Sequence, residues 1–118
     1  MERYVLTLDL QDDARLIAEY ERWHQEVWPE IKESIFGSGI RRMEIYRFSN
    51  RLVMVMETDD GFSFEQKAEA DAANPRVQEW EQLMWTYQRP VRGANPGEKW
   101  VLMDKIFELS RLDIEHER

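Results

Sequence analysis

The stretch IRRMEIYRFSNRLVMVME, residues 40–57, predicts a β-hairpin and indicates the fold class. Its halves, 40–48 and 51–57, are rich in residues that favour strands, and the link Phe48-Ser49-Asn50-Arg51 is short enough for a hairpin. Large apolar side chains occur on both faces of these strands: Met43, Ile45, Met54 and Met56 on one face, and Tyr46, Phe48, Val53 and Val55 on the other. We therefore expect both faces of the sheet to be covered.

The segment before the hairpin predicts a strand and a helical region. Residues 3–10 alternate as a strand does, and Asp12 or Asp13 can cap the helix that follows. Apolar residues then recur at helical spacing as far as Ile35. Pro29 falls inside this pattern, and because proline has no backbone N–H, we expect a kink or a break there.

The segment after the hairpin predicts a second helical region and a last strand. The helical region begins near Gly61 and is interrupted by Asn74-Pro75, where asparagine suits the N-cap and proline the first helical turn. Residues 90–97 contain two prolines and two glycines and predict a loop. Residues 99–109 predict the last strand.

The order of these elements predicts an α+β domain with the ferredoxin-like βαββαβ pattern over residues 1–110. Residues 111–118 are expected to form a charged, mobile C-terminal tail. In this fold both helices cover one face of an antiparallel sheet. Since the second face is also apolar, a second sheet could cover it, which predicts a homodimer of the dimeric α/β-barrel type.

The composition limits the classes of partner. With a formal net charge of -8 and no basic stripe, the chain is not expected to bind nucleic acid. No apolar run approaches the roughly 18 residues of a membrane helix, so no membrane contact is expected. The chain has no cysteine and its first residues do not resemble a secretory signal, which fits a cytoplasmic protein.

His24 is the strongest candidate for a catalytic residue. It falls within an apolar helical arc, and Tyr20, His24 and Trp28 follow one another at intervals of four. The other histidine, His116, lies in the charged tail. An unperturbed pKa of about 6.5 would let His24 accept and donate a proton near neutral pH. The alternative is a structural histidine that is hydrogen-bonded to a backbone carbonyl.

Other kinds of chemistry have little support in the sequence. One credible histidine with scattered carboxylates does not make a transition-metal site, and neither a phosphate-binding loop nor a nucleophile elbow is present. We therefore expect neither a metal nor an organic cofactor. The five tryptophans and four tyrosines can belong to the core, or can stack on the apolar faces of a sugar ring.

The segment Tyr20-Glu-Arg-Trp-His24-Gln-Glu-Val-Trp28-Pro29-Glu30-Ile31 resembles the L-rhamnose mutarotase family. A helix of that family carries the pattern Tyr-x-x-x-His-x-x-x-Trp-Pro-Glu-Leu. The similarity covers most of residues 3–109, and its further matches are Gly39-x-x-x-x-x-Ile45-Tyr46, Gln78-x-Trp80 and Ala94-Asn95-Pro96.

The resemblance implies an enzyme that interconverts the α and β anomers of a deoxy sugar, with His24 as the catalytic residue. It implies sugar contacts for Tyr20 and Trp80, and Trp28 is a further candidate for binding. Rhamnose enzymes usually have a tyrosine where this chain has Met43 and a second tryptophan where it has Glu81. Because of these two departures we expect L-fucose to be preferred over L-rhamnose.

Mutarotation fits these residues. The reaction removes a proton from the anomeric hydroxyl and delivers one to the ring oxygen, and it involves no redox step. Tyr20, Glu81, water and the substrate all stay open as the second proton carrier. The same element order also occurs in two rival classes: cofactor-free monooxygenase-like proteins of the dimeric α/β-barrel type, and non-enzymatic modules that bind small molecules.

Overall fold

The structure is a computed structural model, and it describes residues 1–112. Five strands and four helices follow one another in this order: β1 (Glu2–Leu10), α1 (Ala14–Gln25), α2 (Pro29–Gly37), β2 (Ile40–Phe48), β3 (Arg51–Thr58), α3 (Phe64–Ala72), α4 (Pro75–Trp85), β4 (Gln88–Arg89) and β5 (Val101–Leu102). Each predicted helical region consists of two helices. The expected charged tail and His116 lie largely or wholly outside the described residues.

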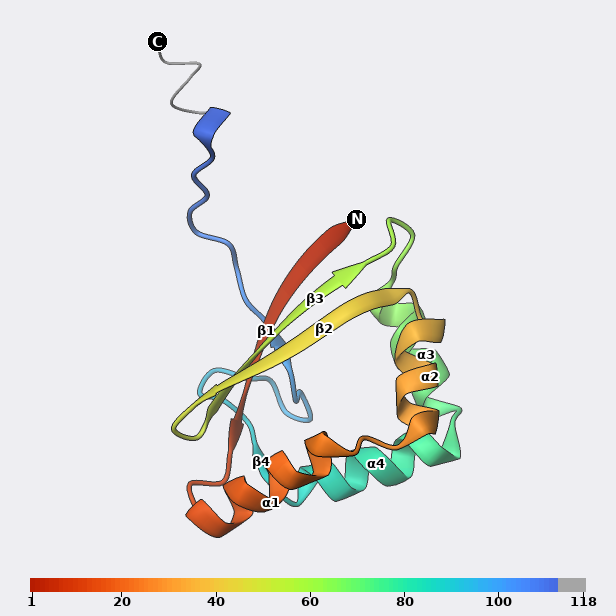
Figure 1. Cartoon of the computed structure of the whole chain (residues 1–118), viewed down its shortest axis with the longest axis vertical. Helices are drawn as coiled ribbons and strands as arrows, with labels where there is room; N and C mark the ends of the chain where they lie inside the picture. The colour runs from red at the N-terminus through yellow and green to blue at the C-terminus, as the bar shows by residue number, and fades with distance from the viewer. Residues whose placement is uncertain (113–118) are drawn as a thin grey trace.

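The strands form one antiparallel sheet with the order β2-β3-β1-β4, and the helices lie against one of its faces (Figure 1). β5 also pairs with β1, next to β4 on the same edge. The long strands β1, β3 and β2 make up most of the sheet. This arrangement confirms the expected α+β, ferredoxin-like fold.

The predicted hairpin is formed by β2 and β3. Phe48 pairs with Arg51, so Ser49 and Asn50 alone make the turn, and Ser49 adopts a positive φ of 54°. The register also places Met43 opposite Met56 and Ile45 opposite Met54. Side chains that pair directly across two strands share a face. These four residues therefore line up on the inner face of the sheet, toward the helices.

The helix boundaries follow from local chemistry. Asp13 caps α1 by accepting a hydrogen bond from the Leu16 backbone N–H at 3.0 Å. α1 ends at Gln25, and α2 begins at Pro29, which confirms that the proline marks a break. The break separates α1 from α2, and the cavity described below is lined by residues of both helices.

The last strand is shorter than the sequence predicts. We expected a strand over residues 99–109, but β5 covers Val101 and Leu102 alone, and one further hydrogen bond joins the Met103 N–H to the Val5 carbonyl at 2.8 Å. Beyond Met103 the chain leaves the sheet and extends away from the body of the molecule (Figure 1). An apolar sequence forms a strand only where a neighbouring strand completes its hydrogen bonds, and this segment has none within residues 1–112.

The core lies between the inner face of the sheet and the helices, in two groups of buried residues. One group is Leu10, Tyr20, Ile31, Leu52, Val77, Trp80, Met84 and Tyr87, and the other is Leu6, Ile40, Met54 and Met56. The two groups flank a cavity, so the side chains that anchor the fold also form the walls of the candidate site. Among residues 1–112 no helix combines the length and the apolarity needed to cross a bilayer.

Candidate active site

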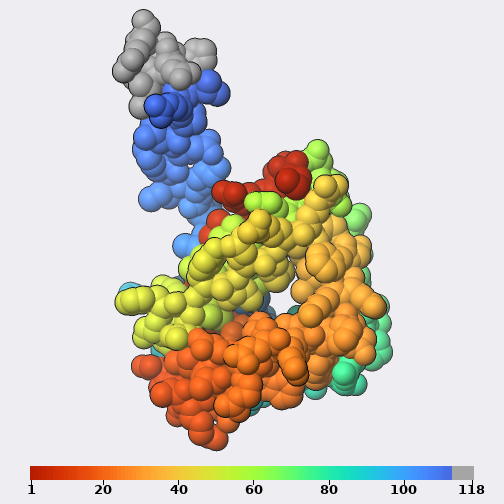
Figure 2. Space-filling model, in the orientation of Figure 1, coloured from red at the N-terminus to blue at the C-terminus, as the bar shows by residue number. Residues whose placement is uncertain are grey.

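A cavity of about 370 Å³ lies between the inner face of the sheet and the helices. Figure 2 shows an opening into the molecule between β2, in yellow, and the helices α1 and α2, in orange. Most of the lining is apolar, with Met43, Ile45, Met54 and Met56 from the strands. The polar lining groups are Tyr20, His24, Ser34, Lys67, Asp71, Glu81, Gln88 and Lys99. An apolar cavity with a few polar groups is typical of a small-molecule site.

His24 lies in the last turn of α1 and lines this cavity. Its Nδ1 is 2.9 Å from the Tyr20 backbone carbonyl oxygen. A carbonyl oxygen can only accept, so Nδ1 carries the proton in the neutral ring and Nε2 is the proton acceptor. Burial lowers the pKa of His24 from 6.5, and the hydrogen bond to the carbonyl opposes this effect. The ring is therefore mainly neutral at pH 7.

Tyr20 lies one turn before His24, with the two ring centroids 4.3 Å apart. Tyr20 is 3% exposed and lines the cavity. Burial raises the pKa of Tyr20 to about 12, and a side-chain hydrogen bond with Gln88 opposes this effect. Tyr20 therefore keeps its proton at physiological pH, so it can offer a hydroxyl donor to a ligand but no phenolate base.

Trp80 comes from α4 and is the centre of an aromatic group beside His24. Its ring centroid is 5.8 Å from that of His24 and 5.0 Å from that of Trp28. α4 is fixed by Asn74, whose side chain accepts hydrogen bonds from two backbone N–H groups of the first turn. Trp80 is buried and lines the cavity, so it can stack on a bound ring.

Trp28 is the one predicted site residue that does not line the cavity. It packs against Trp23 and Trp80, and the Arg76 guanidinium stacks on its ring at 3.7 Å. The reason is the break between the helices. Trp28 is the N-cap of α2 with φ -55° and ψ 137°, so it does not continue the stripe of Tyr20 and His24 along α1. Trp28 therefore packs against Trp80 without lining the cavity itself.

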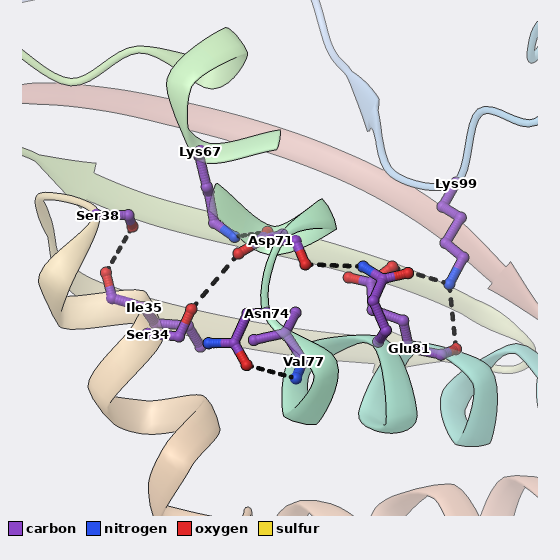
Figure 3. A network of polar contacts seen from close by, with 10 residues as sticks. Ser34, Ile35, Ser38, Lys67, Asp71, Asn74, Val77, Glu81 and Lys99 are labelled. Atoms are coloured by element: carbon purple, nitrogen blue, oxygen red, sulfur yellow. Dashed lines mark hydrogen bonds and ion pairs between the residues drawn. The ribbon is translucent and has the colours of Figure 1, made fainter. Parts of the chain in front are cut away.

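Met43 and Glu81, the two positions that depart from the rhamnose pattern, both line the cavity. Glu81 forms an ion pair with Lys99, with 3.1 Å between Oε2 and Nζ, and the same Nζ donates to the Glu81 backbone carbonyl at 3.2 Å (Figure 3). This ion pair ties Lys99, which lies just before β5, to α4. The Glu81 side chain therefore lines the cavity while it stays 43% exposed.

A second polar group forms another part of the wall, where α2, α3 and α4 meet. Asp71 pairs with Lys67 at 2.5 Å and accepts a hydrogen bond from the Ser34 hydroxyl at 3.4 Å (Figure 3). The Gln78 side chain donates to the Asp71 backbone carbonyl at 2.9 Å. These contacts hold the three helices together beside the cavity.

The sequence did not predict several of the lining residues, above all Gln88, Lys99, Lys67 and Asp71. The charged residues lie in stretches that resemble solvated surfaces, and their pairing depends on how the elements meet in space. Gln88 lies in a strand of two residues, which is too short to show any periodicity. Among the described residues, no group of three or more His, Asp or Glu side chains could hold a metal ion.

The model of the L-rhamnose mutarotase family matches residues 3–109. The chain belongs to the L-rhamnose mutarotase family. It is therefore an enzyme, a mutarotase that interconverts sugar anomers. This agrees with the resemblance carried by the segment around His24.

Two relatives and one solved structure illustrate the family. The L-fucose mutarotase of Xanthomonas campestris is 49% identical over 112 residues, which cover 93% of this chain and 90% of that protein. The L-rhamnose mutarotase of Listeria monocytogenes is 28% identical over 96 residues, covering 78% and 85%. The crystal structure of an L-rhamnose mutarotase from Formosa agariphila has a TM-score of 0.67 at 18% identity, covers 93% of this chain and 100% of its own, and confirms the fold.

Proposed function

We propose that this mutarotase acts on L-fucose, with L-rhamnose as a poorer substrate, and that His24 transfers the proton. The proposal rests on the protonation state of His24 in the cavity wall. The Tyr20 carbonyl holds Nδ1 at 2.9 Å, and burial keeps the ring neutral, so Nε2 is left to accept a proton. A neutral imidazole in the wall of a mainly apolar cavity is suited to general acid–base catalysis on a sugar.

This geometry supports the following reaction. Nε2 takes the proton of the anomeric hydroxyl, the electrons of that O–H bond form the aldehyde C=O, and the bond from the anomeric carbon to the ring oxygen breaks. The ring oxygen keeps the bonding pair and receives a proton. The anomeric oxygen and the ring oxygen are bonded to the same carbon. The imidazolium of His24 is therefore also within reach of the ring oxygen. Rotation about the bond to the aldehyde carbon and reclosure give the other anomer.

Tyr20 and Trp80 hold the sugar in this mechanism. Trp80 offers an aromatic surface beside His24. Tyr20 offers a hydroxyl that stays protonated because its pKa is raised to about 12. Such positioning adds to the effect of proton transfer, because it holds the anomeric centre next to the imidazole. No step requires a metal or an organic cofactor, and their absence from the reaction stays a prediction.

Met43 and Glu81 support the preference for L-fucose. Both line the cavity, so substitutions there change contacts with the substrate. The relative at 49% identity is named L-fucose mutarotase, whereas the relatives named for L-rhamnose that are cited above are more distant. A carboxylate paired with Lys99 offers acceptors to sugar hydroxyls where rhamnose enzymes usually place an indole.

The experiment is a saturation-transfer NMR measurement of anomer exchange for L-fucose and L-rhamnose on the wild type and on Met43→Tyr/Glu81→Trp. We expect faster exchange of L-fucose in the wild type and a shift toward L-rhamnose in the double variant. Faster exchange of L-rhamnose by the wild type would contradict the assignment. An unchanged preference in the double variant would show that these two positions do not set it.

We also propose that two copies of the chain pack their sheets together in the cytoplasm. The outer face of the sheet carries half-buried valines at 5, 53 and 55 next to Tyr46, which is 56% exposed. The extended segment after β5 adds Ile106 and Phe107, 95% and 76% exposed. A monomer rarely leaves so much apolar surface in water. Sedimentation at micromolar concentration should give twice the monomer mass of 14.3 kDa, and a stable monomer would contradict this proposal.

A further inference from the structure

Gln88 is a buried polar residue in the cavity wall for which the proposed mechanism has no role. It begins β4 and pairs with Leu10 of β1. Residues that pair directly across antiparallel strands point to the same face, so the side chain of Gln88 lies on the inner face with that of Leu10. It is 5% exposed and lines the cavity, whereas the next residue, Arg89, is exposed.

The side-chain oxygen of Gln88 has no hydrogen-bond partner. Within residues 1–112 its Oε1 is the one buried side-chain nitrogen or oxygen for which this is true. Proteins pair the large majority of such atoms, because an orphaned acceptor weakens the fold. A methionine of similar length would fill the same space without this cost. A polar residue kept here at the expense of stability therefore points to a ligand that completes the bond.

The neighbours of Gln88 place it beside the reacting centre. Its backbone carbonyl already accepts a hydrogen bond from the Gln11 side chain at 3.1 Å, so the main chain is fixed. Its side chain interacts with Tyr20, whose ring centroid is 4.3 Å from that of His24. Gln88, Tyr20 and His24 are therefore neighbours in the wall of the cavity.

We propose that Gln88 is a specificity residue whose Oε1 accepts a hydrogen bond from one ring hydroxyl of the bound sugar, other than the anomeric hydroxyl. This inference rests on the proposed function, in which His24 takes the anomeric proton. The terminal torsion of glutamine is soft, so rotation about it can turn Oε1 toward the cavity that the side chain lines. A sugar that lacks this hydroxyl, or holds it in the opposite orientation, leaves the acceptor unpaired and binds more weakly.

The test compares Gln88→Met with the wild type on L-fucose and on its 2-, 3- and 4-deoxy derivatives. Dissociation constants come from tryptophan fluorescence, since Trp80 and Trp100 line the cavity, and anomer exchange is measured by NMR on the same samples. In the wild type one deoxy sugar should bind about tenfold more weakly than L-fucose. In Gln88→Met, the affinity for L-fucose should fall about tenfold, and the affinity for that same deoxy sugar should not fall any further.

The matched control is Gln82→Met, which alters an exposed glutamine of α4 that does not line the cavity. It should not change the ranking of the four sugars. Equal losses for all four sugars in Gln88→Met would show a merely structural role and overturn the proposal, while exchange by the wild type would leave the mutarotase function standing. If Gln88→Met fails to fold, a wild type that binds all four sugars equally well overturns the proposal by itself. A wild type that neither binds nor interconverts any of them overturns the proposal together with the L-fucose assignment.

Discussion

Tyr20→Phe distinguishes a hydroxyl that binds the sugar from a group that transfers the proton. The pKa of Tyr20 is about 12, so at pH 7 the ionised fraction is about 10⁻⁵, from the difference of five between pKa and pH. A phenol that almost never ionises can hold a sugar oxygen but is a poor proton carrier. Loss of one hydrogen bond costs about 0.5–1.5 kcal/mol, which corresponds to a two- to twelvefold weaker affinity.

We therefore expect Tyr20→Phe to raise the KM for L-fucose by about that factor and to leave kcat within about threefold. Concentration-dependent exchange rates from NMR separate the two constants. Tyr87→Phe is the matched control, because Tyr87 is also buried but does not line the cavity, and its hydroxyl accepts a hydrogen bond from Trp23 Nε1 at 3.1 Å. A fall in kcat of about 10²–10⁴-fold in Tyr20→Phe would instead identify Tyr20 as the proton carrier and refute this reasoning.

Three further predictions concern pH, the aromatic group and the cap of α4. The exchange rate should rise with pH through a midpoint below 6.5 and then level off, because the neutral ring of His24 accepts the proton and burial lowers its pKa. A midpoint above 6.5 in a pH–rate profile would contradict this. Trp80→Phe should weaken sugar binding by about 1 kcal/mol or more, whereas Trp28→Phe should weaken it less, because Trp80 lines the cavity and Trp28 does not. Calorimetric titration of both variants measures this, and equal losses of affinity would contradict the prediction. Asn74→Ala should lower the free energy of unfolding by about 1 kcal/mol, because its side chain caps α4 with two hydrogen bonds; denaturant unfolding measures this, and no loss of stability would show that the cap is dispensable.

The parts of the fold that the sequence predicted well depend on local chemistry. The short link between β2 and β3 specifies the hairpin, Asp13 and Asn74 cap helices, and Pro29 cannot continue one. Each of these signals lies within a few residues of the feature that it determines. The predicted length of the last strand was wrong for the opposite reason. Strand formation after Met103 requires a partner strand that nothing in the local sequence reveals.

The candidate site was predicted only in part. Tyr20 and His24 lie one turn apart on one helix, so their proximity follows from helical geometry, and the family resemblance added Trp80. Trp28 shares their spacing but lies beyond the end of α1, so its ring does not reach the cavity. The contact between Glu81 and Lys99 joins α4 to the residues before β5, and only the folded chain brings them together.

The central claim is that His24 transfers the proton, and anomer exchange by His24→Ala tests it most directly. The measurement is saturation-transfer NMR on L-fucose, with a thermal melt of the same sample to confirm folding. Gln25→Ala is the control, because it alters the exposed neighbour at the end of the same helix. We predict that His24→Ala stays folded and loses exchange by at least about 100-fold, while Gln25→Ala keeps it. Full exchange by a folded His24→Ala variant would contradict the account.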